Sequence, residues 1–225
     1  MNLLISIGVV LFGYLLGSIP FGFILVKLRT GEDIRQVQSG RTGGTNAMRA
    51  AGKWVGILTG ALDILKSYFA VRLAVAVAPE NFWLHVITPL AVILGHNYSI
   101  FLMRREESGV KFGGGAGGAT AGGGAMGLWF PALYIILPLA FAVFYFVGYA
   151  SMTTLSISVL ATIIFAVRAY LGASPWEYVA YGLASLALVA WALRPNIKRL
   201  MEGNERLHGF RVRHLKKAEG KAGGN

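Results

Sequence analysis

Long apolar runs alternate with short polar stretches along the chain, and this pattern predicts membrane-spanning helices. The first run, Leu3–Val26, has 24 residues without a charge, and a helix needs roughly 20 to cross a bilayer. A signal peptide is the alternative, but the run is too long for a signal h-region and has no basic segment before it. Six further runs predict more spans, the last of them shorter and glycine-rich: Trp54–Val77, Leu84–Leu102, Pro131–Val147, Thr153–Val167, Tyr178–Leu193 and Ala116–Phe130.

Together the runs predict an all-α, polytopic integral membrane helix bundle with about seven transmembrane helices, or about five if two weak segments do not cross. Residues 1–205 are expected to form a single membrane-embedded domain. Residues 206–225 are expected to form a basic, partly disordered cytoplasmic tail at an anionic membrane surface. The chain has no cysteine, which excludes disulfides and thiol chemistry.

The net charge of +11 is distributed in a way that indicates topology. Lysine and arginine gather in three stretches, Lys27–Lys53, Arg104–Lys111 and Arg194–Lys221, while the connections between them are poor in basic residues. The positive-inside rule then places the N-terminus outside and the C-terminus in the cytoplasm. We expect a multi-pass protein of the cell membrane whose polar chemistry faces the cytoplasm. No basic groove interleaved with aromatic residues is visible, so nucleic acid is not an expected partner.

The stretch KFGGGAGGATAGGG (Lys111–Gly124) has eight glycines in its last twelve positions. Glycine lets backbone N–H groups converge on an anion, and a helix that begins there adds its positive dipole end. Unpaired backbone is costly in lipid, so such a loop must be buried in protein or line a polar cavity. The stretch therefore predicts a phosphate site at the cytoplasmic edge, with a plain linker or close helix packing as the alternative. The pattern of a nucleotide-hydrolysing P-loop is absent.

A second polar stretch, QSGRTGGTNAMRAAGK (Gln38–Lys53), combines small hydrogen-bonding residues with cations that suit a phosphate. An ordinary positive-inside loop is the alternative. Its polar side chains of interest are Ser39, Arg41, Thr45, Asn46, Arg49 and Lys53.

Three of the ionisable residues inside predicted spans are candidates for a role at the site. Asp63 and Lys66 are three residues apart and share one helix face, which predicts an ion pair or a role in supporting the site. His96 is the one histidine near the glycine run; it is a candidate general base or, alternatively, a structural residue that fixes a loop.

Polar residues also mark two later segments. Ser151 and Thr154 open a predicted span as caps or as ligands. Asn196 and Arg199 follow the last span, either facing one cavity or lying on lipid headgroups.

Taken together, these stretches resemble the bacterial membrane acyltransferases that move an acyl chain from acyl-phosphate to sn-glycerol 3-phosphate. SGRTGGTNAMR is similar to their GSGNxGATNxxR motif, and LGHNYSIF followed by FGGGAGGAT is similar to GHxxPxF followed by GGKGVAT. GYASMTT resembles YxSLxS, and NIKRLMEGNE resembles part of RHxxNIxRLxxGxE.

The resemblance implies transfer of an acyl group to glycerol 3-phosphate, giving 1-acyl-glycerol 3-phosphate (lysophosphatidic acid) and phosphate in phospholipid synthesis. The implied partners are acyl-phosphate, glycerol 3-phosphate and membrane lipids, and no cofactor or metal is implied. The first motif would contact the substrate headgroups, and the glycine loop with Thr120 would form a phosphate hole. The candidate catalytic residues are Ser39, Arg49, His96, Thr154 and Asn196. The candidate substrate-binding residues are Thr45, Asn46, Lys111, Gly114, Gly115, Gly117, Thr120, Ser151 and Arg199.

The chain departs from the family pattern at four places. Arg41 replaces an asparagine, Gly113 and Ala116 replace lysines, Leu193 replaces a histidine, and residues 104–110 are extra. Lys111 or Arg41 could supply the charge that the loop lacks. Two alternatives to the enzyme are a diverged, low-activity relative that binds phosphorylated lipids or regulates a partner, and an organic-anion transporter.

Overall fold

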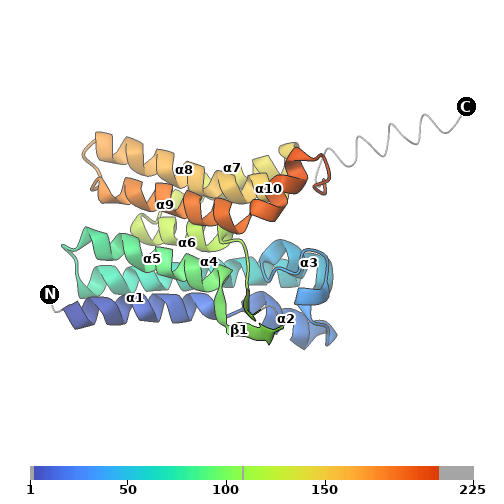
Figure 1. Cartoon of the computed structure of the whole chain (residues 1–225). Coiled ribbons are helices and arrows are strands. Elements are labelled where there is room, and N and C mark those ends of the chain that lie inside the picture. The colour runs from blue at the N-terminus through green and yellow to red at the C-terminus, as the bar shows by residue number, and fades with distance from the viewer. Residues whose placement is uncertain (1–2, 108, 208–225) are drawn as a thin grey trace, which may run out of the picture.

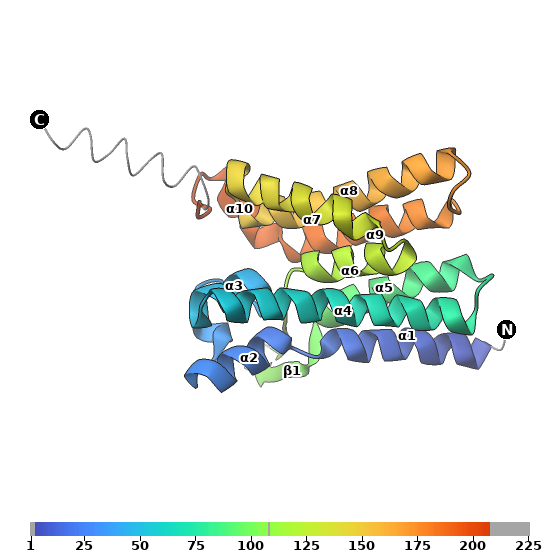
Figure 2. The same cartoon turned by 180° about the vertical axis from the view of Figure 1, so that it is seen from behind.

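Two layers of helices with one short helix between them make up most of the molecule (Figure 1). The computed structural model describes residues 3–107 and 109–207. Seen from either side, the short helix α6 (Gly118–Leu128) lies between the layers (Figure 2). One layer contains α1 (Leu3–Ser18), α4 (Lys53–Val77) and α5 (Phe82–Asn97). The other contains α7 (Ala132–Ala142), α8 (Ala150–Tyr170) and α9 (Glu177–Ala192).

Glycines let α6 occupy this central position. A Cβ on Gly123 would overlap the carbonyl oxygen of Ile64 in α4, and a Cβ on Gly127 would lie 2.6 Å from the Cβ of Val71. From the other layer, the Tyr181 hydroxyl donates to the carbonyl oxygen of Ala121 at 2.6 Å. The small residues of α6 therefore serve backbone-to-backbone packing, as small residues do between membrane helices.

The first predicted span is a helix with a break. α1 is followed, across Ile19 and Pro20, by α2 (Phe21–Thr30), which ends at Gly31 with φ +74°. The short 3₁₀ helix Ile34–Gln36 and α3 (Gly44–Ala51) then complete the first polar stretch before α4 begins.

A β-hairpin corrects the all-α prediction. β1 (Ser99–Glu106) pairs antiparallel with β2 (Gly109–Gly113), and Arg104 lies opposite Lys111. The predicted span Leu84–Leu102 therefore ends at Asn97, where α5 ends. Its apolar continuation, Ile100–Leu102, lies in β1 at an irregularity in the pairing, and only Leu102 of these three side chains is buried.

The other predicted runs coincide with helices, and α7 continues into one π-helical segment, Val143–Val147. Within the described residues, Leu3–Thr30 and Ala150–Tyr170 are long and apolar enough to cross a membrane. A third span results if α9 is counted with α10 (Arg194–Met201) across a 70° bend. The weak seventh run forms α6, which has only 11 residues.

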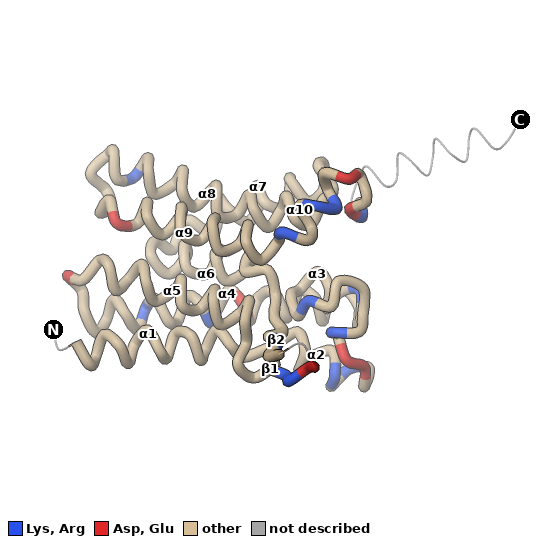
Figure 3. Tube along the Cα trace, in the orientation of Figure 1, with Lys and Arg blue, Asp and Glu red and all other residues tan. Residues whose placement is uncertain are grey.

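Most charged residues lie at one end of the bundle, where α2, α3, the hairpin and α10 gather (Figure 3). We call this the polar end. The predicted tail, residues 206–225, lies outside the described residues from residue 208 onward. Leu207, just before that point, forms an isolated β-bridge with Tyr149.

Candidate functional site

A cavity of about 510 Å³ opens at the polar end. Its walls come from the loop before α3, the end of α5, the hairpin, the glycine loop and the junction of α9 with α10. By glycine loop we mean residues 113–117, which connect β2 to α6. Six of the predicted site residues line the cavity: Ser39, Lys111, Gly114, Gly115, Asn196 and Arg199.

The cavity walls are strongly cationic. No acidic side chain is among the residues that line the cavity in the described part of the chain. The six cationic ones are Arg35, Arg41, Arg104, Lys111, Arg194 and Arg199. Such a surface attracts an anion and disfavours a cationic ligand.

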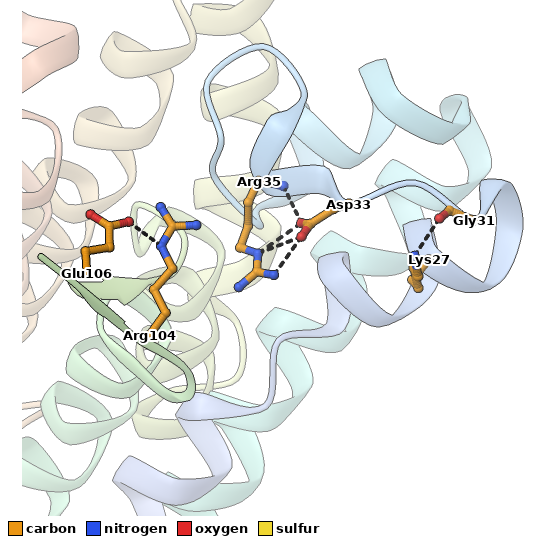
Figure 4. Close-up of polar contacts among 6 residues, drawn as sticks. All are labelled: Lys27, Gly31, Asp33, Arg35, Arg104 and Glu106. Carbon is orange, nitrogen blue, oxygen red and sulfur yellow. Dashed lines mark hydrogen bonds and ion pairs between the residues drawn. The ribbon is translucent and has the colours of Figure 1, made fainter. Parts of the chain in front are cut away.

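Carboxylates outside the cavity form ion pairs with three of these cations, and Figure 4 shows the pairs of Arg35 and Arg104. Asp33 Oδ2 lies 2.6 Å from Arg35 Nη2, and this guanidinium lowers the pKa of the Asp33 carboxyl. Glu106 Oε1 lies 2.7 Å from Arg104 Nε, and Glu106 Oε2 lies 3.5 Å from Lys111 Nζ. One carboxylate therefore pairs with both cations of the hairpin. The hairpin thereby presents two fixed positive groups to the cavity.

Arg41 is the cation that organises the glycine loop. Its Nη1 donates to the carbonyl oxygen of Gly115 at 2.8 Å, and its Nη2 donates to the carbonyl oxygen of Ala192 at the end of α9. Burial, and then repulsion from Arg199, lower the pKa of Arg41. Two guanidinium groups that repel each other across a cavity form a natural site for an anion.

The carbonyl oxygens of the glycine loop are taken up by other parts of the protein. Gly114 accepts from the Thr42 N–H at 3.1 Å, and Gly115 accepts from Arg41. Gly117, at φ +89°, accepts from the Ala121 N–H at 2.8 Å and from the Thr120 hydroxyl at 2.9 Å. In each peptide unit the C=O of one residue and the N–H of the next residue point in opposite directions. When the protein binds the carbonyl oxygens of a loop, the N–H groups therefore point away from those contacts and can bind a ligand.

Five consecutive backbone N–H groups remain available. Within the described residues, none of the N–H groups from Ala116 to Thr120 donates to a protein acceptor. They belong to the loop and to the first turn of α6, where a helix also carries partial positive charge. Successive N–H groups of this kind form an anion-binding nest. The glycine loop and the start of α6 thus offer free N–H groups, and phosphate binding by this loop stays a prediction.

Beneath this loop lies a buried ionic cluster. The predicted pair of Asp63 and Lys66 is confirmed, with Lys66 Nζ 2.7 Å from Asp63 Oδ1. The same Nζ lies 3.1 Å from His96 Nδ1 and 3.1 Å from the carbonyl oxygen of Ile19, at the break between α1 and α2. The His96 carbonyl accepts from the Gly115 N–H at 2.8 Å, and a Cβ on Gly115 would overlap His96 Nε2. His96 thus lies directly against the glycine loop.

Asn46 and Arg49 lie on α3, in the first polar stretch, and do not line the cavity. Asn46 is buried, and its Nδ2 donates to the carbonyl oxygens of Val37 and Arg41, each at 2.9 Å, which fixes the loop that carries Arg41. Burial and Arg206 lower the pKa of Arg49, while the Glu205 carboxylate opposes them. Thr45, on α3, is exposed and does not line the cavity.

Glu205 lies beside the cavity, where it contacts the lining residue Asn196, and it was not among the residues predicted from the sequence. Its carboxylate accepts from the Ser151 hydroxyl at 2.5 Å and from Asn196 Nδ2 at 3.4 Å. The signal available was its place at the end of the GNE sequence in the last motif. Thr154, by contrast, donates to the Ala150 carbonyl oxygen at 2.8 Å, and its methyl group packs against Gly118.

The fold and the site define a helical bundle of membrane-protein character with a cation-lined cavity at its polar end. The family model described as "Glycerol-3-phosphate acyltransferase" matches residues 7–203, and the chain belongs to this family.

Similar proteins are also described as glycerol-3-phosphate acyltransferases. A glycerol-3-phosphate acyltransferase of Rubrobacter xylanophilus is 35% identical over 92% of this chain and 98% of its own length. One of Myxococcus xanthus is 38% identical over 88% of this chain and 96% of its own length. Among solved structures, PlsY (YgiH), an integral membrane glycerol 3-phosphate acyltransferase in its glycerol 3-phosphate form, superimposes with a TM-score of 0.78. It is 32% identical, and the match covers 91% of this chain and 96% of PlsY.

Proposed function

We propose that the chain transfers an acyl group from acyl-phosphate to sn-glycerol 3-phosphate, releasing 1-acyl-glycerol 3-phosphate and inorganic phosphate in phospholipid synthesis. One observation carries the proposal beyond family membership. Five adjacent free N–H groups directly follow Gly115, which lines a cavity whose charged lining residues are all cations. Both substrates carry a phosphate, and a site of this kind binds phosphate through backbone and charge together.

The reaction follows from where charge develops. A glycerol hydroxyl attacks the acyl carbonyl carbon, the carbonyl oxygen becomes an oxyanion, and the bond to phosphate then breaks. Donors aimed at the oxyanion and at the departing phosphate lower this barrier. The N–H groups of the glycine loop, with Arg41 and Arg199, are the donors that the cavity offers. A basic oxygen of a bound phosphate accepts the hydroxyl proton.

His96 is proposed to donate a hydrogen bond in this reaction. His96 Nδ1 lies 3.1 Å from Lys66 Nζ and 3.4 Å from Asp63 Oδ1. We propose the tautomer in which Nδ1 accepts from the Lys66 ammonium and the ring proton resides on Nε2. That Nε2 faces the glycine loop at Gly115. A neutral imidazole held in this way can donate a hydrogen bond toward bound phosphate, whereas a general base would need a free ring nitrogen there.

The other candidate residues divide into two groups. Ser39, Asn196, Arg199 and Lys111 line the cavity and are proposed to contact substrate. A second group lies outside the cavity lining and is proposed to support the site. In it, Asn46 fixes the loop that carries Arg41, Ser151 contacts Glu205, and Thr154 packs against Gly118. Thr45 and Arg49, both on α3, complete this group.

We further propose seven spans, with the N-terminus outside, the C-terminus in the cytoplasm, and the site at the cytoplasmic face of the cell membrane. The concentration of charge at the polar end supports this orientation (Figure 3). Charge at one end does not favour the transporter alternative, because alternating access needs a polar path to both faces.

The test is release of inorganic phosphate by the detergent-purified protein given palmitoyl-phosphate, with and without glycerol 3-phosphate. Release that requires both substrates and collapses in Arg199→Ala, whose guanidinium lines the cavity, supports the proposal. Arg29→Ala, in the exposed last turn of α2, is the matched control and should keep wild-type activity. No release with intact glycerol 3-phosphate binding would overturn the enzyme and favour the binding relative.

A further inference from the structure

Asn97 is a buried polar residue beside the glycine loop. It is the last residue of α5, follows His96 directly, and is only 5% exposed. It also lines the anion cavity. Its backbone packs against Gly114, where a Cβ would lie 2.5 Å from the Asn97 carbonyl carbon.

The side chain of Asn97 has no partner within the described residues, at either Oδ1 or Nδ2. Buried amides are almost always hydrogen-bonded, because leaving both ends unpaired forfeits the interactions they had with water. The amide is aimed at the start of α6: a Cβ on Gly117 would lie 3.0 Å from Oδ1 and 3.2 Å from Nδ2. Its two hydrogen-bonding ends therefore face the place where the free N–H groups converge.

We propose that the carboxamide of Asn97 binds glycerol 3-phosphate at the glycine loop. Nδ2 donates to a phosphoryl oxygen, and Oδ1 accepts a hydroxyl of the glycerol moiety. This inference rests on the proposed function and adds a residue that discriminates among phosphates. A ligand with a phosphate and a nearby hydroxyl satisfies both ends of the amide, whereas inorganic phosphate leaves Oδ1 without a hydroxyl from a glycerol chain.

Geometry supports a neutral donor at this position. The cations of the cavity supply attraction over several ångströms, but they do not distinguish one phosphate ester from another. An amide that offers one donor and one acceptor in a fixed plane imposes an orientation on the ligand. In addition, the His96 Nε2 faces Gly115, so adjacent residues at the end of α5 would present two donors to one anion.

Two substitutions and one control test the proposal. Asn97→Leu keeps the approximate size and removes both polar ends, and Asn97→Asp keeps the shape but replaces the donor with a negative charge. Asn81→Leu is the control at the other end of the same helix, where Asn81 Oδ1 caps α5 by accepting from the Leu84 N–H at 3.0 Å. We expect Asn81→Leu to lower the melting temperature and to leave the KM for glycerol 3-phosphate unchanged.

Asn97→Leu should raise the KM and the calorimetric Kd for glycerol 3-phosphate roughly 10- to 100-fold, as for loss of a hydrogen bond to a charged group. Its melting temperature without ligand should equal or exceed that of wild type, because an unpaired buried amide is removed. Asn97→Asp should weaken binding further. The Kd for inorganic phosphate should rise less than that for glycerol 3-phosphate in Asn97→Leu.

Unchanged glycerol 3-phosphate binding in either variant would overturn the proposal. A lower melting temperature with an unchanged Kd in Asn97→Leu would also overturn it, since that pattern marks a structural amide. Calorimetry keeps this test separate from the reaction. If wild type binds glycerol 3-phosphate but releases no phosphate from palmitoyl-phosphate, the proposed enzyme fails while the role of Asn97 is still decided by the binding constants.

Discussion

Arg41 Nη1 donates to the carbonyl oxygen of Gly115 at 2.8 Å, so a cation of the first polar loop fixes a peptide of the glycine loop. The C=O of Gly115 and the N–H of Ala116 belong to that one peptide and point in opposite directions. Anchoring the oxygen therefore orients the N–H for a ligand. Arg41 anchors the Gly115 carbonyl oxygen from a position where the family pattern has asparagine.

Replacing Arg41 with alanine should lower kcat/KM roughly 10- to 100-fold, because two carbonyl oxygens lose a charged donor. Arg41→Lys should recover only part of the activity, since one ammonium lacks the fork that spans the Gly115 and Ala192 oxygens. Phosphate-release kinetics measure the effect, with Arg29→Ala as control. Wild-type activity in Arg41→Ala would show that the loop keeps its conformation without this anchor.

Gly117→Ala should abolish most of the activity. Gly117 has φ +89°, which disfavours any side chain, and a Cβ there would crowd the Asn97 amide at 3.0 Å. Gly172→Ala is the matched control, because Gly172 also has a positive φ, +68°, but faces open space far from the site. Both variants should lose about 1 kcal/mol of stability, and only Gly117→Ala should lose activity. Equal activity in the two would contradict a specific role for this turn.

Lys66→Met should destabilise the protein by about 3–5 kcal/mol, because it leaves the Asp63 carboxylate buried without its cation. The double variant Asp63→Asn/Lys66→Met should regain most of that stability, since no unpaired charge remains. It should still have a low kcat, because His96 Nδ1 has lost its donor. Thermal unfolding and kinetics together separate these effects, and Arg72→Met, on the exposed side of α4, is the control. Full activity in the double variant would show that the cluster supports the fold alone.

Ser151 and Glu205 should behave as one unit. The Ser151 hydroxyl donates to the Glu205 carboxylate at 2.5 Å, so Ser151→Ala and Glu205→Ala remove the same contact. A double-mutant cycle on kcat/KM should give a coupling free energy of about 1–3 kcal/mol. Additive effects of the two substitutions would mean that each residue acts separately.

Acid should weaken the loop that carries Arg35. Because Arg35 lowers the pKa of Asp33 below its ordinary value of 3.8, the folded state favours the ionised carboxylate. Its stabilising effect is present above that value and is lost as the pH falls through the lowered pKa. The difference in melting temperature between wild type and Asp33→Asn should stay constant above about pH 5 and shrink below pH 3.8. A difference that grows on acidification would contradict this sign.

The sequence predicted the helices and the glycine loop well because each has a strong local signal. Apolar runs of sufficient length mark the spans, and the glycine run marks the loop together with the first part of α6. The hairpin was missed because Ile100–Leu102 extends an apolar run, and the strand character of β1 depends on its pairing with β2 on either side of these residues. Arg41, Asn97 and Glu205 owe their importance to contacts with distant segments or to the lack of a partner. Neither property is visible in the order of residues.

The contacts of Arg41 also bear on biosynthesis. Its partners Gly115 and Ala192 follow it by 74 and 151 positions, so the nascent chain contains the arginine long before it contains either acceptor. Because N-terminal segments emerge and fold first, the anion site stays incomplete until α9 has entered the bundle beside α6. A prematurely terminated chain that lacks α9 can place its early helices but has no assembled binding cavity. Ligand binding thus reports that the late half of the chain has joined the early half.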